Sequence, residues 1–313
     1  MKRHGQNKGH FDATIANIIG GSFEEQVVFA QQTVGVQSYA NEERDAAMKD
    51  DMSETTAITR LEFTTDAGAG ARARIGLLVL ESDQTMEWEM RLMTHLSGVS
   101  VYHARLANDV VVTPETLANM EKELPKAAAL LPDYLKLNAL GYGCTSGTTI
   151  IGEDRVASIL DGKHPGVPSS NPLTAAKAAL RTLGVRRLGL VTPYTPDVTQ
   201  AMQNRFEDAG ISITTVGSFY EDSDAVVGRI DPQAILEAAI SVGSSEAVDG
   251  VFISCTSLRA AGIIAQAEAT LHKPVTASNH ALAWHLLRLA GIADEIEGFG
   301  QLFKSQPLAE TDR

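Results

Sequence analysis

The two cysteines of this 313-residue chain lie in two short segments of the same pattern. Cys144 opens the run Cys-Thr-Ser at 144–146, and Cys255 opens the same run at 255–257. Each run follows an apolar segment that is typical of a buried parallel strand. If a helix begins at each cysteine, its free amides and positive end lower the pKa of the thiol. The same amides can hold a carboxylate or an enolate oxygen.

Two thiols on opposite sides of a bound carbon could work as a base and an acid. One thiol would remove the proton α to a carboxylate, and the other would return a proton to the opposite face. This chemistry is racemisation without a cofactor. A single cysteine at a strand end is usually a small buried hydrophobe, and a disulfide between the two is a further alternative. The repetition of the whole Cys-Thr-Ser run favours a chemical role.

A second pair of similar segments precedes the two cysteines. Residues 74–79 read Arg-Ile-Gly-Leu-Leu-Val, and residues 187–192 read Arg-Leu-Gly-Leu-Val-Thr. From Gly76 to Cys144 is 68 positions, and from Gly189 to Cys255 is 66. The sequence therefore predicts two similar Rossmann-like α/β domains with parallel sheets, related by a pseudo-two-fold axis. The active site is expected in the cleft between them, with one cysteine from each.

The remaining pattern alternates strands with helices, which implies parallel sheets and right-handed crossovers. Strands are predicted at 75–80, 99–106, 137–142, 188–191, 211–216, 251–254 and 272–276. Helices are predicted at 86–96, 114–131 with a break at Pro125, 173–183, 198–209, 231–240, 258–271 and 279–290, the last capped by Ser278 or Asn279. Residues 161–172 are predicted as a loop. Ligands bind beyond the carboxyl ends of such strands, where Asp83 and Tyr194 also lie.

The predicted domain boundaries follow from these elements. Residues 1–60 are polar and are interpreted as a poorly ordered, loosely attached extension, with an arm that packs on a second subunit as the alternative. Residues 61–177 form the first α/β domain and 178–279 the second. Residues 280–313 are expected to pack back on the first domain.

The bulk composition disfavours several classes of function. A net charge of −13 disfavours nucleic acid and an anionic membrane surface as partners. No apolar run approaches the roughly 18 residues that cross a bilayer. Two cysteines do not make a disulfide framework, so free thiols in a reducing cytoplasm are expected. His280 and His285 lie on different faces of a helix, so no metal site is predicted.

Four segments carry a resemblance to a known family. They are Gly-Cys-Thr-Ser-Gly-Thr at 143–148, Ser-Cys-Thr-Ser-Leu at 254–258, Val-Thr-Pro-Tyr at 191–194 and Glu-Ser-Asp-Gln-Thr-Met-Glu at 81–87. From about residue 60 to 291 the chain resembles the Asp/Glu racemase superfamily, in its maleate isomerase and arylmalonate decarboxylase branch. Within that branch it is most similar to the ectoine-utilisation racemase-like proteins. The decarboxylases lack the first cysteine, so simple decarboxylation is disfavoured.

This resemblance implies roles for individual residues. Cys144 and Cys255 would be the catalytic pair, working without metal, pyridoxal phosphate or nucleotide. A substrate carboxylate would be held by side chains and amides beside them, and the substrate-binding residues so implied are Thr85, Thr145, Ser146, Tyr194, Thr256 and Ser257. The alternative for Tyr194, which lies between two prolines, is simple packing of its loop. A homodimer is implied by the resemblance alone.

Two acidic residues depart from the pattern of the maleate isomerases. Asp83 and Asp224 stand where those enzymes carry asparagine, and a carboxylate there would repel a dicarboxylate and attract an ammonium group. We therefore expect both to bind substrate, which would be an amino acid of the diaminobutyrate type from ectoine or hydroxyectoine breakdown. The alternatives are a helix cap for Asp83 and a solvated acidic loop for Asp224.

Two other functions stay open at this point. One is a cis–trans isomerase of the maleate type, in which one cysteine adds to a double bond as a nucleophile. The other is an amino-acid-binding protein that kept the fold without the chemistry, since a fold does not guarantee a function.

Overall fold

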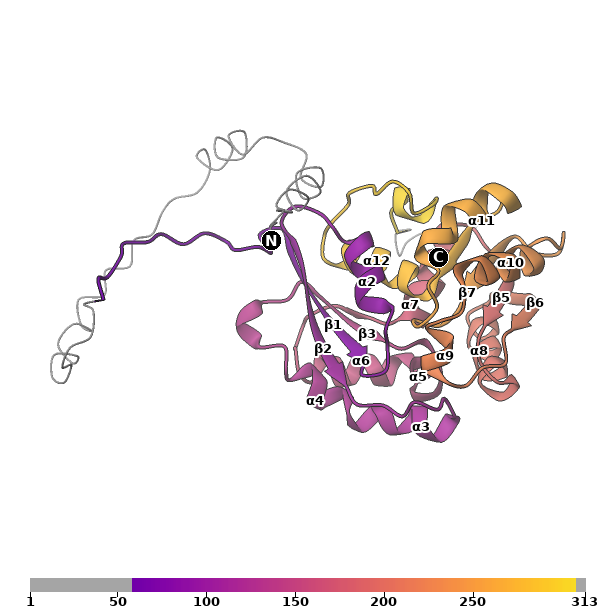
Figure 1. Ribbon diagram of the computed structural model, residues 1–313, viewed down its shortest axis with the longest axis horizontal. Helices are drawn as coiled ribbons and strands as arrows, with labels where there is room; N and C mark the ends of the chain where they lie inside the picture. Colours follow the sequence, from indigo (N-terminus) through magenta and orange to yellow (C-terminus); the bar gives the residue numbers. More distant parts are fainter. Residues whose placement is uncertain (1–57, 308–313) are drawn as a thin grey trace, which may run out of the picture. The chain divides into compact units, whose positions relative to one another are not determined.

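A computed structural model describes residues 58–307 of the chain (Figure 1). Residues up to Gly68 and residues from Ala69 onward form two separate units. In the first of them, residues 58–68 contain no helix or strand. The predicted extension at 1–60 falls almost wholly outside the described residues. Every helix and strand that the structure describes belongs to the second unit.

Two parallel four-stranded sheets form the framework of the second unit. The strand order is β2-β1-β3-β4 in the first sheet and β6-β5-β7-β8 in the other. Their bounds are β1 Ala73–Leu80, β2 Val99–Leu106, β3 Ala139–Gly143, β4 Ser169–Ser170, β5 Arg187–Thr192, β6 Ser212–Ser218, β7 Gly250–Ile253 and β8 Val275–Ala277. The equivalent order of the two sheets confirms the predicted pair of α/β halves with parallel strands. The repeated apolar segments are β1 and β5, which lie inside their sheets and are buried on both faces.

The helices connect the strands and cover the sheets. They are α2 Met86–Met93, α3 Pro114–Asn119, α4 Leu124–Ala128, α5 Thr145–Ile151, α6 Glu153–Asp161, α7 Pro172–Thr182, α8 Pro196–Glu207, α9 Asp224–Val227, α10 Pro232–Gly243, α11 Ile264–Leu271 and α12 Ser278–Leu289. In Figure 1, α2 and α12 lie on one side of the first sheet, and α3 and α4 lie on the other. Helix α12 packs on α7 and, in the first half, on α2 and β3. The predicted domain boundaries themselves stay predictions.

Proline and small polar residues fix several helix starts, as predicted. Thr113 accepts a hydrogen bond from the amide of Thr116 and precedes Pro114 at the start of α3. Asn171 caps α7 in the same way, one residue before Pro172. These signals are local, which is why the sequence alone could predict the start of α3 at Thr113 and Pro114.

Three predicted elements are wrong in part. The helix predicted over 114–131 is interrupted at Met120–Lys122 by a 3-10 turn, and α4 restarts with Pro125 in its first turn, where its missing N–H costs nothing. Residues 169–170, predicted as loop, form β4 at the edge of the first sheet. Neither Ser278 nor Asn279 caps α12, because both lie inside the helix, after Ala277.

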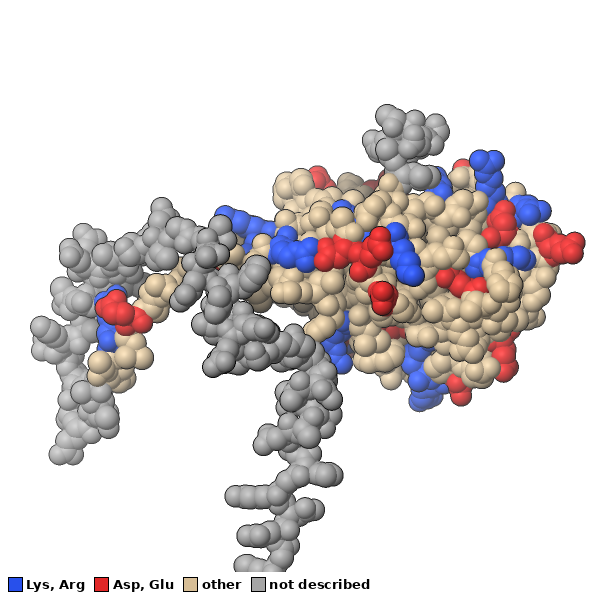
Figure 2. Space-filling view, turned by 90° about the horizontal axis from the view of Figure 1, so that it is seen from above, with Lys and Arg blue, Asp and Glu red and all other residues tan. Residues whose placement is uncertain are grey.

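Charged side chains of both signs lie on the described surface. On the face in Figure 2, basic and acidic side chains are interspersed. No helix among residues 58–307 is long and apolar enough to cross a membrane.

Candidate active site

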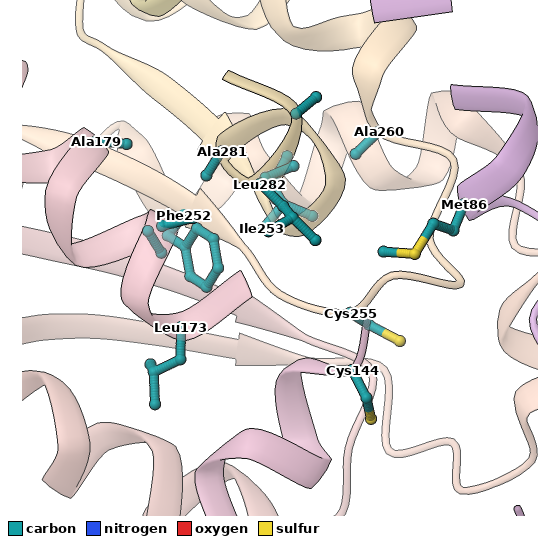
Figure 3. Packing of buried hydrophobic residues seen from close by; sticks show 14 of the residues in the cluster. Met86, Cys144, Leu173, Ala179, Phe252, Ile253, Cys255, Ala260, Ala281 and Leu282 are labelled. Carbon is teal, nitrogen blue, oxygen red and sulfur yellow. The ribbon is translucent and has the colours of Figure 1, made fainter. Parts of the chain in front are cut away.

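The two cysteines line one pocket between the two halves of the second unit. Cys144 directly follows β3, and Cys255 follows β7 after Ser254 (Figure 3). The free space of the pocket is about 10 Å³, which holds no more than one water molecule. Residues 110–112 and 222–224 pair as a short antiparallel bridge and contribute Val111, Val112 and Asp224 to its lining.

Cys144 occupies the position that the sequence predicts. It is the N-cap residue of α5, and its Sγ accepts a hydrogen bond from the amide of Gly147 at 3.2 Å. The hydroxyl of Ser146 lies 3.6 Å from the same sulfur. Gly147 is required here, because a Cβ on it would lie 2.4 Å from the Tyr142 hydroxyl and 3.0 Å from the sulfur. The thiol is thus fixed tightly at the start of a helix.

Cys255 has a different backbone, and the prediction of a helix directly after it is wrong. Residues 256–258 form a turn, a 3-10 turn follows at Ala261–Ile263, and α11 begins only at Ile264. Cys255 itself has φ +118°, a conformation that L residues rarely adopt. Such strain typically costs about 1–3 kcal/mol and is found at functional sites. The pseudo-symmetry of the two halves ends at this residue.

The pKa values of both thiols are raised, which corrects the expectation that they are lowered. Burial raises the pKa of Cys144 to about 11, and the Ser146 hydroxyl and the Gly147 amide offset only part of this rise. Burial raises the pKa of Cys255 still further, and the charge of Asp224 adds to the rise. The amides at a helix end do not compensate for the loss of water around a sulfur.

The two predicted acidic residues lie beside the thiols. Asp224 lines the pocket and accepts a hydrogen bond from the Ser82 hydroxyl at 2.7 Å. Asp83 is 1% exposed, and its Oδ1 accepts the amides of Thr85 and Met86, each at 2.8 Å. Its Oδ2 has no hydrogen-bond partner among the described residues. Burial raises the pKa of both carboxyls, and the charge of Asp83 adds to the rise for Asp224. Asp83 thus precedes Thr85, the N-cap residue of α2, and uses one oxygen to accept two amides at the start of the helix.

The structure brings seven of the ten predicted site residues to the pocket. These are Cys144, Thr145, Ser146, Tyr194, Asp224, Cys255 and Thr256. Asp83, Thr85 and Ser257 lie behind the lining: the hydroxyl of Thr85 donates to the Ser257 carbonyl at 2.8 Å, and the hydroxyl of Ser257 is 3.5 Å from Asp224. Tyr194 is buried, with its hydroxyl 3.4 Å from that of Ser254. The substrate-binding roles of all these residues stay predictions.

Sequence reasoning missed one wall of the pocket. It consists of Leu80, Asn108, Asp109, Val111, Val112, Thr116, Leu117 and Met120. Most of these follow the carboxyl end of β2, so the rule that ligands bind beyond strand ends contained the signal. Ser278 was also missed as a site residue. Its hydroxyl lies 2.7 Å from that of Thr145 and accepts the amide of Cys255 at 2.9 Å, so it joins the two cysteine loops.

The charge of the lining limits what can bind. It includes Asp109 and Asp224 but no Lys, Arg or His. A dianion would enter a partly buried acidic site without a compensating cation, which is costly. Hydroxyls and backbone amides remain to hold a single carboxylate. Among residues 58–307 no group of three or more His, Cys, Asp or Glu could hold a metal ion.

The sequence of this chain is similar to those of several known enzymes. A family model described as arylmalonate decarboxylase matches residues 154–303. The maleate isomerase of Geobacillus stearothermophilus is 24% identical over 246 residues, which cover 74% of this chain and 98% of that protein. The arylmalonate decarboxylase of Bordetella bronchiseptica is 29% identical over 140 residues, 44% of this chain and 58% of that protein.

A solved structure resembles the present one over most of its length. It is a cysteine-to-serine mutant of the Nocardia farcinica maleate cis-trans isomerase with a covalently bound succinylcysteine intermediate, 25% identical, with a TM-score of 0.69. The match covers 74% of this chain and 98% of that one. The resemblance to the maleate isomerase and arylmalonate decarboxylase branch is thereby confirmed, and the prediction of an isomerase fits these relatives.

Proposed function

We propose, from the premise that this chain is related to the maleate isomerases and arylmalonate decarboxylases, that it is a cofactor-independent amino-acid racemase or epimerase. Cys144 and Cys255 exchange the α-proton of the substrate. One observation carries the proposal: a single pocket is lined by two thiols and two carboxylates and by no basic side chain. An α-amino acid offers the ammonium group that such a lining favours and the single carboxylate that the hydroxyls can hold.

The substrate is oriented by groups on both sides of the pocket. Its carboxylate binds the hydroxyls and amides of the two Cys-Thr-Ser runs, chiefly those of Ser146 and Thr256, which line the pocket. Its ammonium group faces Asp224. Electrostatic complementarity of this kind selects an amino acid over a dicarboxylate.

The substrate also activates the thiol that attacks it. Asp224 is one of the charges that raise the pKa values of Cys144 and Cys255. An ammonium group beside Asp224 neutralises that charge, so both thiol pKa values fall when substrate binds. One thiol releases its proton to solvent water as the substrate binds, and the thiolate so formed takes the proton from the α-carbon while the electron pair of the C–H bond moves into the carboxylate. The opposite thiol then gives its proton to the other face of the carbon.

A second cationic group on the substrate would be attracted by the charge of Asp83, which lies behind the lining of the pocket. Asp83 keeps one buried carboxylate oxygen without a hydrogen bond, and it lies close enough to Asp224 to raise the pKa of that carboxyl. A diaminobutyrate-type compound carries two nitrogen groups, which supports an intermediate of ectoine or hydroxyectoine breakdown as the substrate.

The test is proton NMR in deuterium oxide with a panel of amino acids that includes diaminobutyrate and its acetylated and hydroxylated forms. Loss of the α-proton signal, with inversion seen by chiral chromatography, is the expected result. Cys144→Ser and Cys255→Ser should each abolish two-way racemisation. Full turnover in both variants would overturn the two-thiol mechanism.

A maleate-type cis–trans isomerase is the second candidate, and the relatives named above favour it. There one cysteine would add to the double bond, allow rotation about the resulting single bond, and leave. The acidic lining argues against a dicarboxylate. Conversion of maleate to fumarate, with no exchange across the amino-acid panel, would replace the first proposal with this one. Binding of an amino acid without either reaction would indicate a binding protein.

The assembly and location of the protein are further parts of the proposal. A homodimer is proposed from the resemblance, and its mass in solution, measured by light scattering, tests it. A cytoplasmic location is proposed because Cys144 and Cys255 are both free thiols. The expected partner is a small amino-acid or carboxylate substrate.

A further inference from the structure

Three successive residues of the Cys255 loop are each held through a backbone atom by a side chain from elsewhere in the fold. The amide of Cys255 donates to the hydroxyl of Ser278 at 2.9 Å. The carbonyl of Thr256 accepts the side-chain amide of Asn279 at 2.8 Å. The carbonyl of Ser257 accepts the hydroxyl of Thr85 at 2.8 Å. All six of these residues are buried.

The three side chains come from two elements that meet beside the loop. Ser278 and Asn279 are the first two residues of α12, and Thr85 directly precedes α2. A fourth residue, Glu89 of α2, connects the two elements. Its Oε2 accepts the amide of Asn279 at 2.8 Å, and its Oε1 accepts the backbone amide of Ala261 at 2.7 Å. The support of the loop therefore extends into the first half of the molecule.

This support explains how Cys255 keeps an unfavourable backbone. At φ +118° the residue is strained, and no helix follows to fix it, unlike Cys144. Strained residues persist only where the surrounding structure holds them. Hydrogen bonds to the peptide groups at Cys255, Thr256 and Ser257 supply that hold. Loss of any one leaves a buried polar group unpaired and lets the loop relax.

We propose that Thr85, Ser278, Asn279 and Glu89 are positioning residues that hold the Cys255 thiol in its reactive orientation. The inference rests on the proposed function for its catalytic meaning, because it assumes that Cys255 exchanges a proton. Its structural content, that these side chains fix the Cys255 loop, is independent of any substrate. None of the four lines the pocket that contains the two thiols.

The sharpest test uses two substitutions at one residue. Thr85→Val keeps the shape of the side chain but removes the donor to Ser257, whereas Thr85→Ser keeps the donor. Alkylation of the two thiols by iodoacetamide, measured by mass spectrometry, gives the ratio of Cys255 to Cys144 labelling in one molecule. We expect this ratio to rise about tenfold in Thr85→Val, the effect of one buried hydrogen bond, and to return toward the wild-type value in Thr85→Ser.

Ser278→Ala gives a second and independent measurement. It removes the acceptor of the Cys255 amide, so hydrogen exchange of a peptide that covers residues 254–258 should accelerate by about tenfold. Ser170→Ala is the matched control, because Ser170 is an equally buried serine whose hydroxyl is 2.8 Å from His285 Nδ1. Circular dichroism confirms that each variant is folded.

The outcomes separate this inference from the proposed function. Unchanged labelling ratios in Thr85→Val, together with unchanged exchange in Ser278→Ala, would overturn the positioning role even if racemisation is found. Raised ratios with no turnover of any amino acid would keep the positioning role and overturn the proposed reaction. If both hold, kcat for α-proton exchange should fall in Thr85→Val and recover in Thr85→Ser.

Discussion

Because Glu89 is buried, the free energy of unfolding of this protein should fall as the pH rises from about 5 to 8. The carboxyl is fully buried, and burial raises its pKa from 4.5 to about 7, while the amides of Ala261 and Asn279 lower it in part. Asp83 is the charged group that faces it, and its charge adds to the rise. The folded protein therefore keeps a proton that the unfolded chain releases above pH 4.5.

The difference between the pKa of Glu89 in the folded and the unfolded state sets how the free energy of unfolding changes with pH. Below pH 4.5 the carboxyl is protonated in both states, and its contribution to stability is fully present. Between pH 4.5 and 7 unfolding releases a proton, so the free energy of unfolding falls by about 1.4 kcal/mol per pH unit. Above pH 7 the loss is complete. Between pH 5 and pH 8 Glu89 alone removes about 2.5 kcal/mol, roughly 5 to 10 °C in Tm for a domain of this size.

Glu89→Gln removes this titration. In glutamine an NH2 group, which cannot accept, replaces one of the two oxygens that accept the amides of Ala261 and Asn279, so the variant should be less stable at pH 5 by about 1–3 kcal/mol. This gap should close by about 2.5 kcal/mol at pH 8, because only the wild type loses stability. Urea unfolding at pH 5, 6, 7 and 8 measures both curves. Glu115→Gln, on the exposed surface of α3, is the control and should change stability by no more than about 0.5 kcal/mol. A constant gap between Glu89→Gln and wild type across this range would refute the reasoning.

Two further predictions concern the first cysteine. Gly147→Ala places a Cβ 2.4 Å from the Tyr142 hydroxyl and 3.0 Å from the Cys144 sulfur, so the rate of α-proton exchange should fall at least tenfold. The overpacking should lower the free energy of unfolding by about 1–3 kcal/mol, which the better helix propensity of alanine offsets in part. Gly162→Ala, whose Cβ meets nothing closer than 3.4 Å, is the control, and equal exchange rates in the two variants would contradict the packing argument. Because the pKa of Cys144 is about 11, its alkylation rate without substrate should rise about tenfold per pH unit from pH 7 to 10. A plateau below pH 9 would show that the thiol is ionised more easily than its burial implies.

Local signals in the sequence were enough to predict most of the named residues that line the pocket. The repeated Cys-Thr-Ser runs follow apolar strands, and the ends of parallel strands meet at one edge, so Cys144, Cys255 and Tyr194 could be placed in one pocket in advance. Thr113 and Asn171 cap helices in the structure through contacts within three residues of themselves. Such signals need no knowledge of the rest of the fold. Seven of the ten predicted site residues line the pocket for this reason.

The errors share a physical cause. Residues 258–263 look helical, but Cys255 adopts φ +118°, and the loop is held by residues distant in the chain. Glycine would be the ordinary choice for that conformation, so the sequence carries no sign of it. The thiol pKa values were expected to fall near helix ends, yet burial raises them, and burial depends on how the halves close over the pocket.

What the sequence by itself determined is the pair of α/β halves, the position of a thiol at a strand end in each, and the acidic character of the residues around them. Only the tertiary structure decided two hydrogen bonds between residues far apart in the chain. Thr85 and Ser257 are 172 positions apart, and Glu89 and Asn279 are 190 positions apart. Periodicity and capping report interactions between neighbours in the chain. The strained backbone of Cys255 and the raised pKa values of both thiols depend instead on contacts that exist only after the two halves have packed together.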